Sequence, residues 1–339
     1  MISTCNWIVS PGQDPYRNIA LEKYLTVHSG EGACVLYLWR NRPSVIIGRN
    51  QNPWEECRLS EMREDGVCLA RRFSGGGAVY HDPGNVNFSF LTRKEDSDID
   101  RQSEVILRGI RKLGVPAERT GRNDLTAEGR KFSGNAFYET GGCSCHHGTI
   151  MLEVDTEAME KYLSVPAAKL RSRGISSVRS RVINLKEICP EISASALRDA
   201  MLEAFQEVYG IPAEPLEPGS GAEAEIQREA ERLASPEWLF PPRIPFTAEI
   251  SGRFPWGGVR IGLCVRGDRV QAAECESDAM DERLIREIQG ALPGCLLDGN
   301  AMAERVRIAA ERCGESDGDA FPRAWIAQDL SEWILDQRW

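Results

Sequence analysis

Residues Ser74 to Gly77 limit what this chain can be more than any other segment, because they read Ser-Gly-Gly-Gly between two apolar stretches of strand-like composition. Consecutive glycines turn backbone amides toward an anion, and no Cβ blocks a ligand's approach. No Gly-Lys-Ser/Thr ends the run and a strand follows it, so neither a Walker loop nor a dinucleotide fingerprint fits. With Arg71 and Arg72 close before it, separated from it by Phe73, the run predicts an anion-binding loop rather than a plain flexible turn.

A second candidate for anion binding lies in the segment Asp124–Phe132. Its pattern predicts a hairpin that turns at Glu128-Gly129, with Lys131 on the returning arm. Arg130 and Lys131 should point to opposite faces, because side chains alternate along a strand. A solvated lysine is the simplest interpretation. The glycines on either side open the backbone around Lys131, however, and a compact ammonium can neutralise a carboxylate or phosphate oxygen.

The remaining pattern predicts alternating strands and helices. The predicted strands are Val35–Trp39, Val45–Ile47, Val67–Phe73, Val86–Leu91 and His147–Val154. The predicted helices are one capped by Asp14-Pro15, then Asn52–Glu64, Ser103–Leu113, Thr156–Leu163 and Ser193–Val208. Asp82-Pro83-Gly84-Asn85 has the sequence of a type II turn.

A change of composition marks a predicted domain boundary near residues 236–246. A chain of 339 residues favours two domains. Prolines recur from Pro212 to Pro245 on both sides of a charged helix, Ala222–Leu233. We therefore expect domains at 1–240 and 246–339. The second domain should be a small α+β unit, with a hairpin (Val259–Val265 and Val270–Ala273) followed by helices Asp281–Leu292 and Ala301–Cys313.

Charge and cysteine content restrict the function classes. Lys and Arg number 41 against 51 Asp and Glu, and this net charge of −10 disfavours generic binding to nucleic acid or anionic membranes. The first residues lack a signal peptide and no apolar run reaches membrane-spanning length, so a cytoplasmic protein is expected. The 11 cysteines should then be reduced. Cys143–His147 offers soft metal ligands, but no second ligand pair accompanies it and a zinc site is disfavoured.

Several long strings occur in a fixed order: GRNQNPWEEC, RRFSGGGAVYHDPGNVNFSF, GRNDLTAEGRKFSGNAF, HHGTIML and KLRSRGISSVRSRVINL. Together they resemble the lipoate–protein ligase A family over nearly the whole chain. The resemblance implies an α+β fold: a catalytic domain like those of class II aminoacyl-tRNA synthetases and biotin–lipoate ligases, with a mainly antiparallel mixed sheet, and a small α+β accessory domain. It also implies two reactions. Lipoate and ATP form lipoyl-AMP, and an acceptor lysine then displaces AMP.

The same resemblance implies roles for individual residues. Lys131 is implied to be catalytic and to contact both the lipoate carbonyl and the nucleotide phosphate. The implied ATP and lipoyl-AMP site consists of Arg72, Ser74, Gly75, Gly76, Gly77, Ala78, Val79, Tyr80, His81, Lys131 and His147. For each histidine, a structural hydrogen bond is at least as good an interpretation as proton transfer. Asn123 and Asp124 are candidate Mg²⁺ neighbours, although Asp124 can equally cap a turn.

Cofactors and partners follow from the resemblance as well. ATP and Mg²⁺ are the implied cofactors and lipoate the substrate of a monomeric enzyme. The implied acceptors are lipoyl domains of 2-oxoacid dehydrogenase complexes or the glycine-cleavage H protein. Gly174–Arg181 is a candidate cover or acceptor contact, with a solvated basic loop as the alternative. The acyl tunnel's lining cannot be read from the sequence, so lipoate and octanoate are not ranked.

Three rival functions remain open. A cysteine-dependent octanoyl or lipoyl transferase on the same fold needs an activated thiolate. Cys143 and Cys145 lie near His147, but Pro116–Gly121, where that family's nucleophile is expected, has no cysteine. A biotin ligase would carry a different, arginine-rich glycine loop. A non-catalytic lipoate-binding relative would not need Lys131 and the loop. The terminal domain departs from the family at Pro241–Phe246, which leaves its share in adenylation open.

Overall fold

A computed structural model describes residues 1–120, 124–164, 181–219, 221–314, 321–337 and 339. Asn123 and the candidate cover segment as far as Ser180 lie outside the described residues. The contacts within the chain define two units. Unit 1 comprises Met1–Ile46, Trp54–Arg71 and Ala78–Leu239. Unit 2 comprises Ile47–Pro53, Arg72–Gly77 and Phe240–Trp339. The glycine run thus groups with the C-terminal residues, although it is far from them in sequence.

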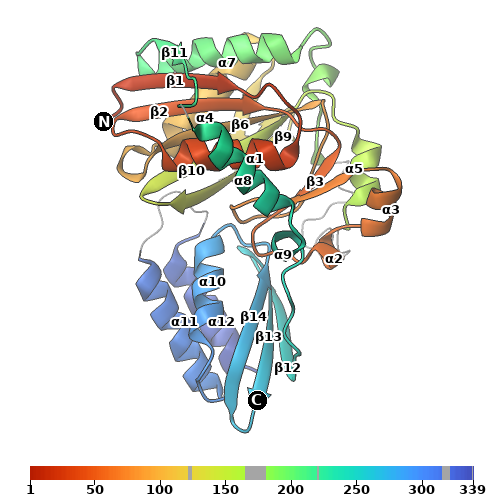
Figure 1. The fold of residues 1–339 in the computed structure, drawn as a ribbon, viewed down its shortest axis with the longest axis vertical. Coiled ribbons are helices and arrows are strands. Elements are labelled where there is room, and N and C mark those ends of the chain that lie inside the picture. The colour runs from red at the N-terminus through yellow and green to blue at the C-terminus, as the bar shows by residue number, and fades with distance from the viewer. Residues whose placement is uncertain (121–123, 165–180, 220, 315–320, 338) are drawn as a thin grey trace. The chain divides into compact units, whose positions relative to one another are not determined.

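Unit 1 is built on a large mixed sheet (Figure 1). The strand order is β11 (Ala213–Pro215), β1 (Thr4–Val9), β2 (Ala33–Trp39), β6 (Asn85–Arg93), β10 (Cys143–Met151), β9 (Arg130–Thr140), β8 (Asp124–Ala127) and β7 (Ala117–Thr120). β1 pairs in parallel with β11 and β2, and the other pairings are antiparallel. The predicted fold class, α+β with a mainly antiparallel mixed sheet, is confirmed.

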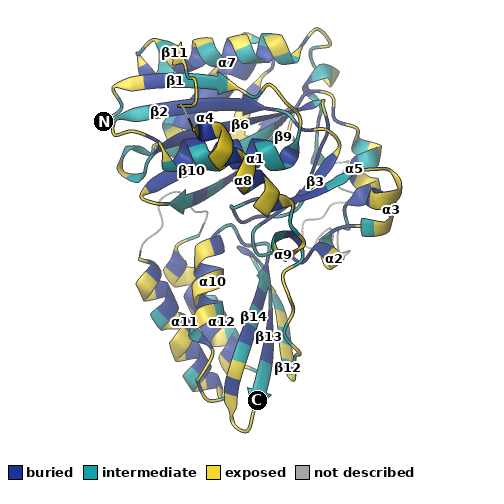
Figure 2. Cartoon of the chain, in the orientation of Figure 1, coloured by how far each residue is buried: buried dark blue, intermediate teal, exposed yellow. Residues whose placement is uncertain are grey.

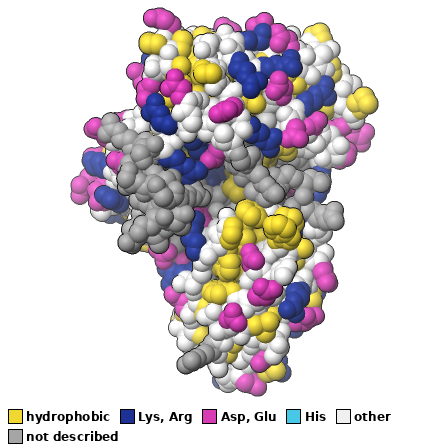
Figure 3. All heavy atoms as spheres, turned by 180° about the vertical axis from the view of Figure 1, so that it is seen from behind, with side chains coloured by type: hydrophobic (Ala, Val, Ile, Leu, Met, Phe, Trp, Pro, Cys, Tyr) yellow, Lys and Arg dark blue, Asp and Glu magenta, His cyan; other side chains and the backbone are white. Residues whose placement is uncertain are grey.

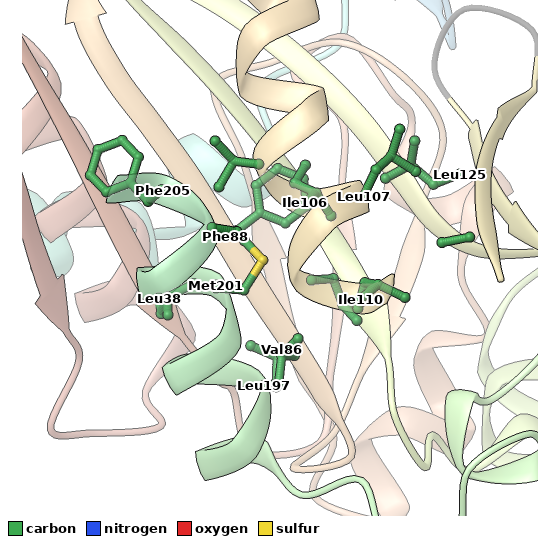
Figure 4. Packing of buried hydrophobic residues seen from close by; sticks show 14 of the residues in the cluster. Leu38, Val86, Phe88, Ile106, Leu107, Ile110, Leu125, Leu197, Met201 and Phe205 are labelled. Atoms are coloured by element: carbon green, nitrogen blue, oxygen red, sulfur yellow. The ribbon is translucent and has the colours of Figure 1, made fainter. Parts of the chain in front are cut away.

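One face of this sheet carries the apolar core. Helices α4 (Ile99–Lys112) and α7 (Ala194–Tyr209) cover it, and their buried faces appear dark blue in Figure 2. Figure 4 shows the packing of Leu38, Val86, Phe88, Ile106, Leu107, Ile110, Leu125, Leu197, Met201 and Phe205. Phe88 and Phe90 point into this core. Ser89 between them must face the other way, because side chains alternate along a strand.

The opposite face of the sheet is more polar and lies against helix α1 (Pro15–Val27). Asp14 caps this helix by accepting bonds from the amides of Tyr16 and Arg17, with Pro15 in the first turn, as predicted. Helix α8 (Ala222–Ala234) packs on α1, and Lys23 pairs with Glu229 at 2.8 Å. The α1 face therefore holds polar side chains away from bulk water.

A second, small sheet in unit 1 has the order β4 (Cys68–Arg71), β3 (Ser44–Ile47), β5 (Val79–His81). Short helices flank the strands of unit 1: α2 (Pro53–Glu56), α3 (Leu59–Glu64), α5 (Thr156–Tyr162) and α9 (Pro236–Leu239). In the described part of unit 1, 3₁₀ turns also lie at Lys94–Asp96 and Leu185–Glu187. The single helix predicted over Asn52–Glu64 is wrong, because the chain leaves helical geometry at Cys57, which forms a bridge with Leu163.

The predicted type II turn at Asp82–Asn85 is also wrong in type. The amide of Asn85 does donate to the Asp82 carbonyl. The φ of Gly84 is not positive, however, whereas a type II turn requires a positive φ at this position. Glycine is needed here for close approach: a Cβ on Gly84 would lie 2.0 Å from the Glu153 carbonyl oxygen.

Unit 2 contains the predicted hairpin within a three-stranded antiparallel sheet, β12 (Ala248–Phe254), β13 (Gly257–Arg266) and β14 (Arg269–Ser277). Helices α10 (Glu282–Ala291), α11 (Gly299–Cys313) and α12 (Arg323–Leu335) complete the unit. Arg323 pairs with Asp281 at 2.5 Å, with both side chains buried. β12 and α12 were not predicted. In the described parts of both units, no helix has the length and apolarity to span a membrane.

Candidate functional site

Within unit 2, Arg72 shapes the glycine run. Its Nε donates to Ser74 Oγ at 3.0 Å, and its Nη2 donates to the carbonyls of Gly75 and Gly77 at 2.6 and 2.8 Å. The side chain is buried. Of the three glycines, Gly76 alone has a positive φ, 86°. The guanidinium predicted to meet a phosphate thus holds the loop's own carbonyls in this structure, leaving the amides as the part that can face a ligand.

The glycine run also packs closely against residues 279 and 280 of the same unit. The Gly76 amide donates to the Ala279 carbonyl at 3.0 Å. A Cβ on Gly75 would lie 2.3 Å from the Met280 carbonyl oxygen. Glycine is therefore required at Gly75 by close approach of backbone. An anion could take the Gly76 amide only in exchange for the Ala279 carbonyl.

Ala78 leads from the run into β5 of unit 1, which carries Val79, Tyr80 and His81. Val79 and Tyr80 pair with Ile46 and Val45 of β3. The His81 ring is buried, and its Nδ1 lies 3.1 Å from Asn41 Nδ2. Since an amide nitrogen only donates, Nδ1 is the acceptor. This bond agrees with the structural role considered for His81.

His147 belongs to a buried polar cluster on the α1 face. Its Nδ1 lies 2.8 Å from Glu22 Oε1, which also accepts a bond from Ser89 Oγ at 2.6 Å. Glu22 is fully buried. Ser89 in turn accepts a bond from Trp39 Nε1 at 3.1 Å. A carboxylate only accepts, so Nδ1 of His147 carries the proton and the ring's orientation is fixed. Glu22 was not among the predicted site residues, and its only signal in the sequence is an acid among the apolar positions of a helix.

Cys145 lies beside this cluster and is fully buried. Burial raises the pKa of its thiol well above the ordinary value, and the Glu22 carboxylate acts in the same direction. Cys145 is thus a protonated thiol rather than an activated thiolate. The ligand atoms of Glu22, Cys145 and His147 lie within 4.8 Å of one another, the spacing of a potential metal site. Glu22 Oε1, however, is already bonded to Ser89 and His147.

The neighbouring His146 faces the core and gives a stability prediction. Burial lowers its pKa from 6.5 to about 3, and its two ring nitrogens lie 2.9 and 3.0 Å from the side-chain oxygens of Gln102 and Asn135, to one of which the neutral ring donates. Below pH 6.5 the unfolded chain takes up a proton that the folded chain does not. The free energy of unfolding therefore decreases as the pH is lowered from 6.5 toward 3. Between pH 7 and 5 this group should remove about 2 kcal/mol of unfolding free energy. Urea unfolding of wild type and His146→Gln at both pH values checks this, and an equal loss in the variant would contradict it.

Lys131 lies on β9, next to β10 with His147. Its Nζ is 2.6 Å from Asp124 Oδ1, at the start of β8. Arg181 Nη2 bonds to the other oxygen, Asp124 Oδ2, at 2.7 Å. A Cβ on Gly134 would lie 2.8 Å from Lys131 Nζ, so glycine makes room for the ammonium. Arg130 pairs instead with Glu187 at 3.0 Å. The candidate Mg²⁺ neighbour Asp124 thus joins two cations.

The predicted site residues therefore divide between the two units. Unit 2 holds Arg72, Ser74, Gly75, Gly76 and Gly77. Unit 1 holds Ala78, Val79, Tyr80, His81, Asp124, Lys131 and His147. Within unit 1 the structure brings Lys131 together with Asp124, and His147 together with Glu22. The face of the molecule drawn in Figure 3 carries Lys and Arg side chains interspersed with Asp and Glu, so the net acidity does not form one anionic field on that face.

These features define an α+β protein with a large mixed sheet and a lysine–aspartate–arginine group at its strands β8 and β9. The lipoyl protein ligase A/B catalytic domain model matches residues 14–206, and the bacterial lipoate protein ligase C-terminus model matches residues 243–316. The chain therefore belongs to the lipoate–protein ligase family, as its sequence strings suggested, and this is a family of ligases.

Solved structures agree with the family assignment. P. falciparum LipL1, in complex with lipoate, is 28% identical with a TM-score of 0.81, covering 98% of this chain and 99% of that one. A bipartite lipoate protein ligase from Thermoplasma acidophilum, described with its E2 lipoyl domain, is 26% identical with a TM-score of 0.64. The match covers 73% of this chain and 100% of that one. A lipoate-protein ligase A bound with ATP is 26% identical with a TM-score of 0.61. The match covers 70% of this chain and 98% of that one.

Proposed function

We propose that this protein is an ATP-dependent lipoate–protein ligase, which forms lipoyl-AMP and transfers the lipoyl group to a lysine of an acceptor domain. The observation that carries the proposal is the partly exposed Lys131 ammonium, which lies over Gly134 and pairs with Asp124 of the neighbouring strand β8. The family membership supports it, as do relatives whose structures contain lipoate or ATP.

In the first step a lipoate carboxylate oxygen attacks the α-phosphorus of ATP, and pyrophosphate leaves with the electrons of the broken bond. Negative charge accumulates on the phosphate oxygens, and Lys131 is the group that neutralises it. The acyl oxygen of lipoyl-AMP is then polarised by the same ammonium. Lys131 would thus act in both reactions.

In the second step the ε-amine of an acceptor lysine attacks the acyl carbon. The amine loses a proton, an amide bond forms and AMP leaves. We propose lipoyl domains of 2-oxoacid dehydrogenase complexes or the glycine-cleavage H protein as acceptors. The relative described with its E2 lipoyl domain supports an acceptor of the first kind. The neutral thiol at Cys145 gives no nucleophile for a thioester route.

Mg²⁺ is part of the proposal. The Asp124 carboxylate offers the hard oxygen ligands that Mg²⁺ prefers, so the residue fits such an ion once one of its two cationic partners moves away. Bound there, Mg²⁺ would neutralise charge on the leaving pyrophosphate. The remaining assignments are also proposed: the ATP and lipoyl-AMP residues named above, domains at 1–240 and 246–339, a monomer and a cytoplasmic location.

Incubation with lipoate, Mg²⁺ and a lipoyl domain, with and without ATP, tests the proposed function. Mass spectrometry should show a lipoylated acceptor only in the incubation that contains ATP, and AMP and pyrophosphate should be released in the same incubation. Cys143→Ser and Cys145→Ser should retain the ATP requirement, because neither thiol takes part. Lipoylation that ignores ATP and disappears in either cysteine variant would instead establish the transferase.

A further inference from the structure

We infer that Arg181 is a second phosphate-binding cation of this site, and that Asp124 takes the place of the anion between Lys131 and Arg181 until the nucleotide binds. The inference deepens the proposed function and rests on it. It begins from an arrangement in which the two oxygens of one carboxylate each pair with a different cation, Lys131 at 2.6 Å and Arg181 at 2.7 Å. One negative charge faces two positive charges, so the group retains a net positive charge.

The backbone holds Arg181 beside Lys131 independently of Asp124. Val182 forms a parallel bridge with Lys131, and the Ile183 amide donates to the Lys131 carbonyl at 2.9 Å. These bonds fix the chain directly after Arg181 against β9. If the Arg181 side chain leaves Asp124, its guanidinium therefore remains within reach of a ligand that Lys131 contacts.

The exposure of the three side chains suits a ligand site. Lys131 is 29% exposed, Asp124 25% and Arg181 33%. The ion pair Arg323–Asp281 in unit 2 offers a contrast, because its side chains are 8% and 2% exposed and its role is to tie α10 to α12. Partly exposed pairs contribute little to stability. Displacing the Asp124 carboxylate from the two cations by another anion should therefore cost little free energy.

A phosphate is the anion that matches this arrangement. Its oxygens can replace those of a carboxylate, and the planar guanidinium fork of arginine binds phosphate with two parallel hydrogen bonds, whereas lysine acts as a point charge. Arg181 and Lys131 together thus suit an α- or β-phosphate of the nucleotide. Asp124, once released, has both oxygens available for a divalent cation.

Inorganic pyrophosphate is the probe for this inference, because its binding needs neither lipoate nor turnover. Calorimetry without Mg²⁺ should show about tenfold weaker pyrophosphate binding by Arg181→Gln. Arg130→Gln removes the same charge from β9, the strand against which the residues after Arg181 lie. This variant should bind pyrophosphate within about twofold of wild type. Asp124→Asn should bind more tightly than wild type, since the competing carboxylate is neutralised. Arg181→Lys, keeping the charge without the fork, should fall between wild type and Arg181→Gln.

Equal pyrophosphate binding by Arg181→Gln and Arg130→Gln would overturn the role of Arg181. Unchanged or weaker pyrophosphate binding by Asp124→Asn would overturn the proposal that Asp124 occupies the place of the phosphate between Lys131 and Arg181. Neither result touches the proposed function, which stands or falls on whether the wild-type protein makes lipoyl-AMP. A thermal unfolding scan of each variant separates loss of a ligand contact from loss of fold.

Discussion

Replacing Lys131 with alanine is expected to slow formation of lipoyl-AMP by about 10²–10³-fold, the usual effect of removing one group that stabilises developing charge. The Lys131 ammonium on β9 pairs with Asp124 on β8, and the adjacent cation on β9, Arg130, cannot replace it because Arg130 is paired with Glu187. Lipoate-dependent exchange of labelled pyrophosphate into ATP measures the effect on the first step alone.

The fold should survive this substitution. Lys131 is partly exposed, and ion pairs of this kind contribute at most about 1 kcal/mol. Lys186→Ala is the matched control, because Lys186 is also a partly exposed lysine in an ion pair, with Glu153. The control should keep full exchange activity. An active Lys131→Ala enzyme would remove Lys131 from the mechanism.

Replacing Gly148 with alanine is expected to lower the unfolding free energy by about 3 kcal/mol, at the upper end of the range for overpacking. Gly148 lies on β10 directly after His147. A Cβ there would lie 2.6 Å from the Gly134 carbonyl oxygen and 2.6 Å from Phe88 Cζ. The first of these atoms is backbone and the second belongs to a core ring, so neither can move away easily. Urea unfolding measures the loss.

The same substitution should reduce adenylate formation about tenfold or more, because small displacements of catalytic groups have large effects. The strand that must move is β9, and Gly134 on it lies under Lys131 Nζ. Gly12→Ala is the control, since a Cβ at Gly12 meets no atom within 4 Å and its φ is not positive. Wild-type stability and activity in Gly148→Ala would show that β9 and β10 have more room than this structure gives them.

Local rules predicted the elements that local interactions decide. The hairpin of β8 and β9 is an example: Glu128 and Gly129 have φ values of 50° and 74°, which place both residues of the turn in the left-handed region. Asp14-Pro15 correctly predicted the start of α1 for the same kind of reason. Strands β1 and β12 were missed, because their partly exposed or alternating polar residues form a strand only when paired with neighbours.

Taken alone, the sequence determined the fold class and the family and supplied the candidate site residues, because glycine runs, turns and charged motifs are local properties of the chain. The tertiary structure decided which atoms these residues meet. It directed the Arg72 guanidinium to the loop's own carbonyls, and it grouped the glycine run with residues 279 and 280. It also buried Glu22 against His147 and joined Lys131 to Arg181 through Asp124. The pairings of Glu22 with His147, of Asp124 with Arg181 and of Gly76 with Ala279 join residues distant in the chain, where periodicity and propensity carry no information.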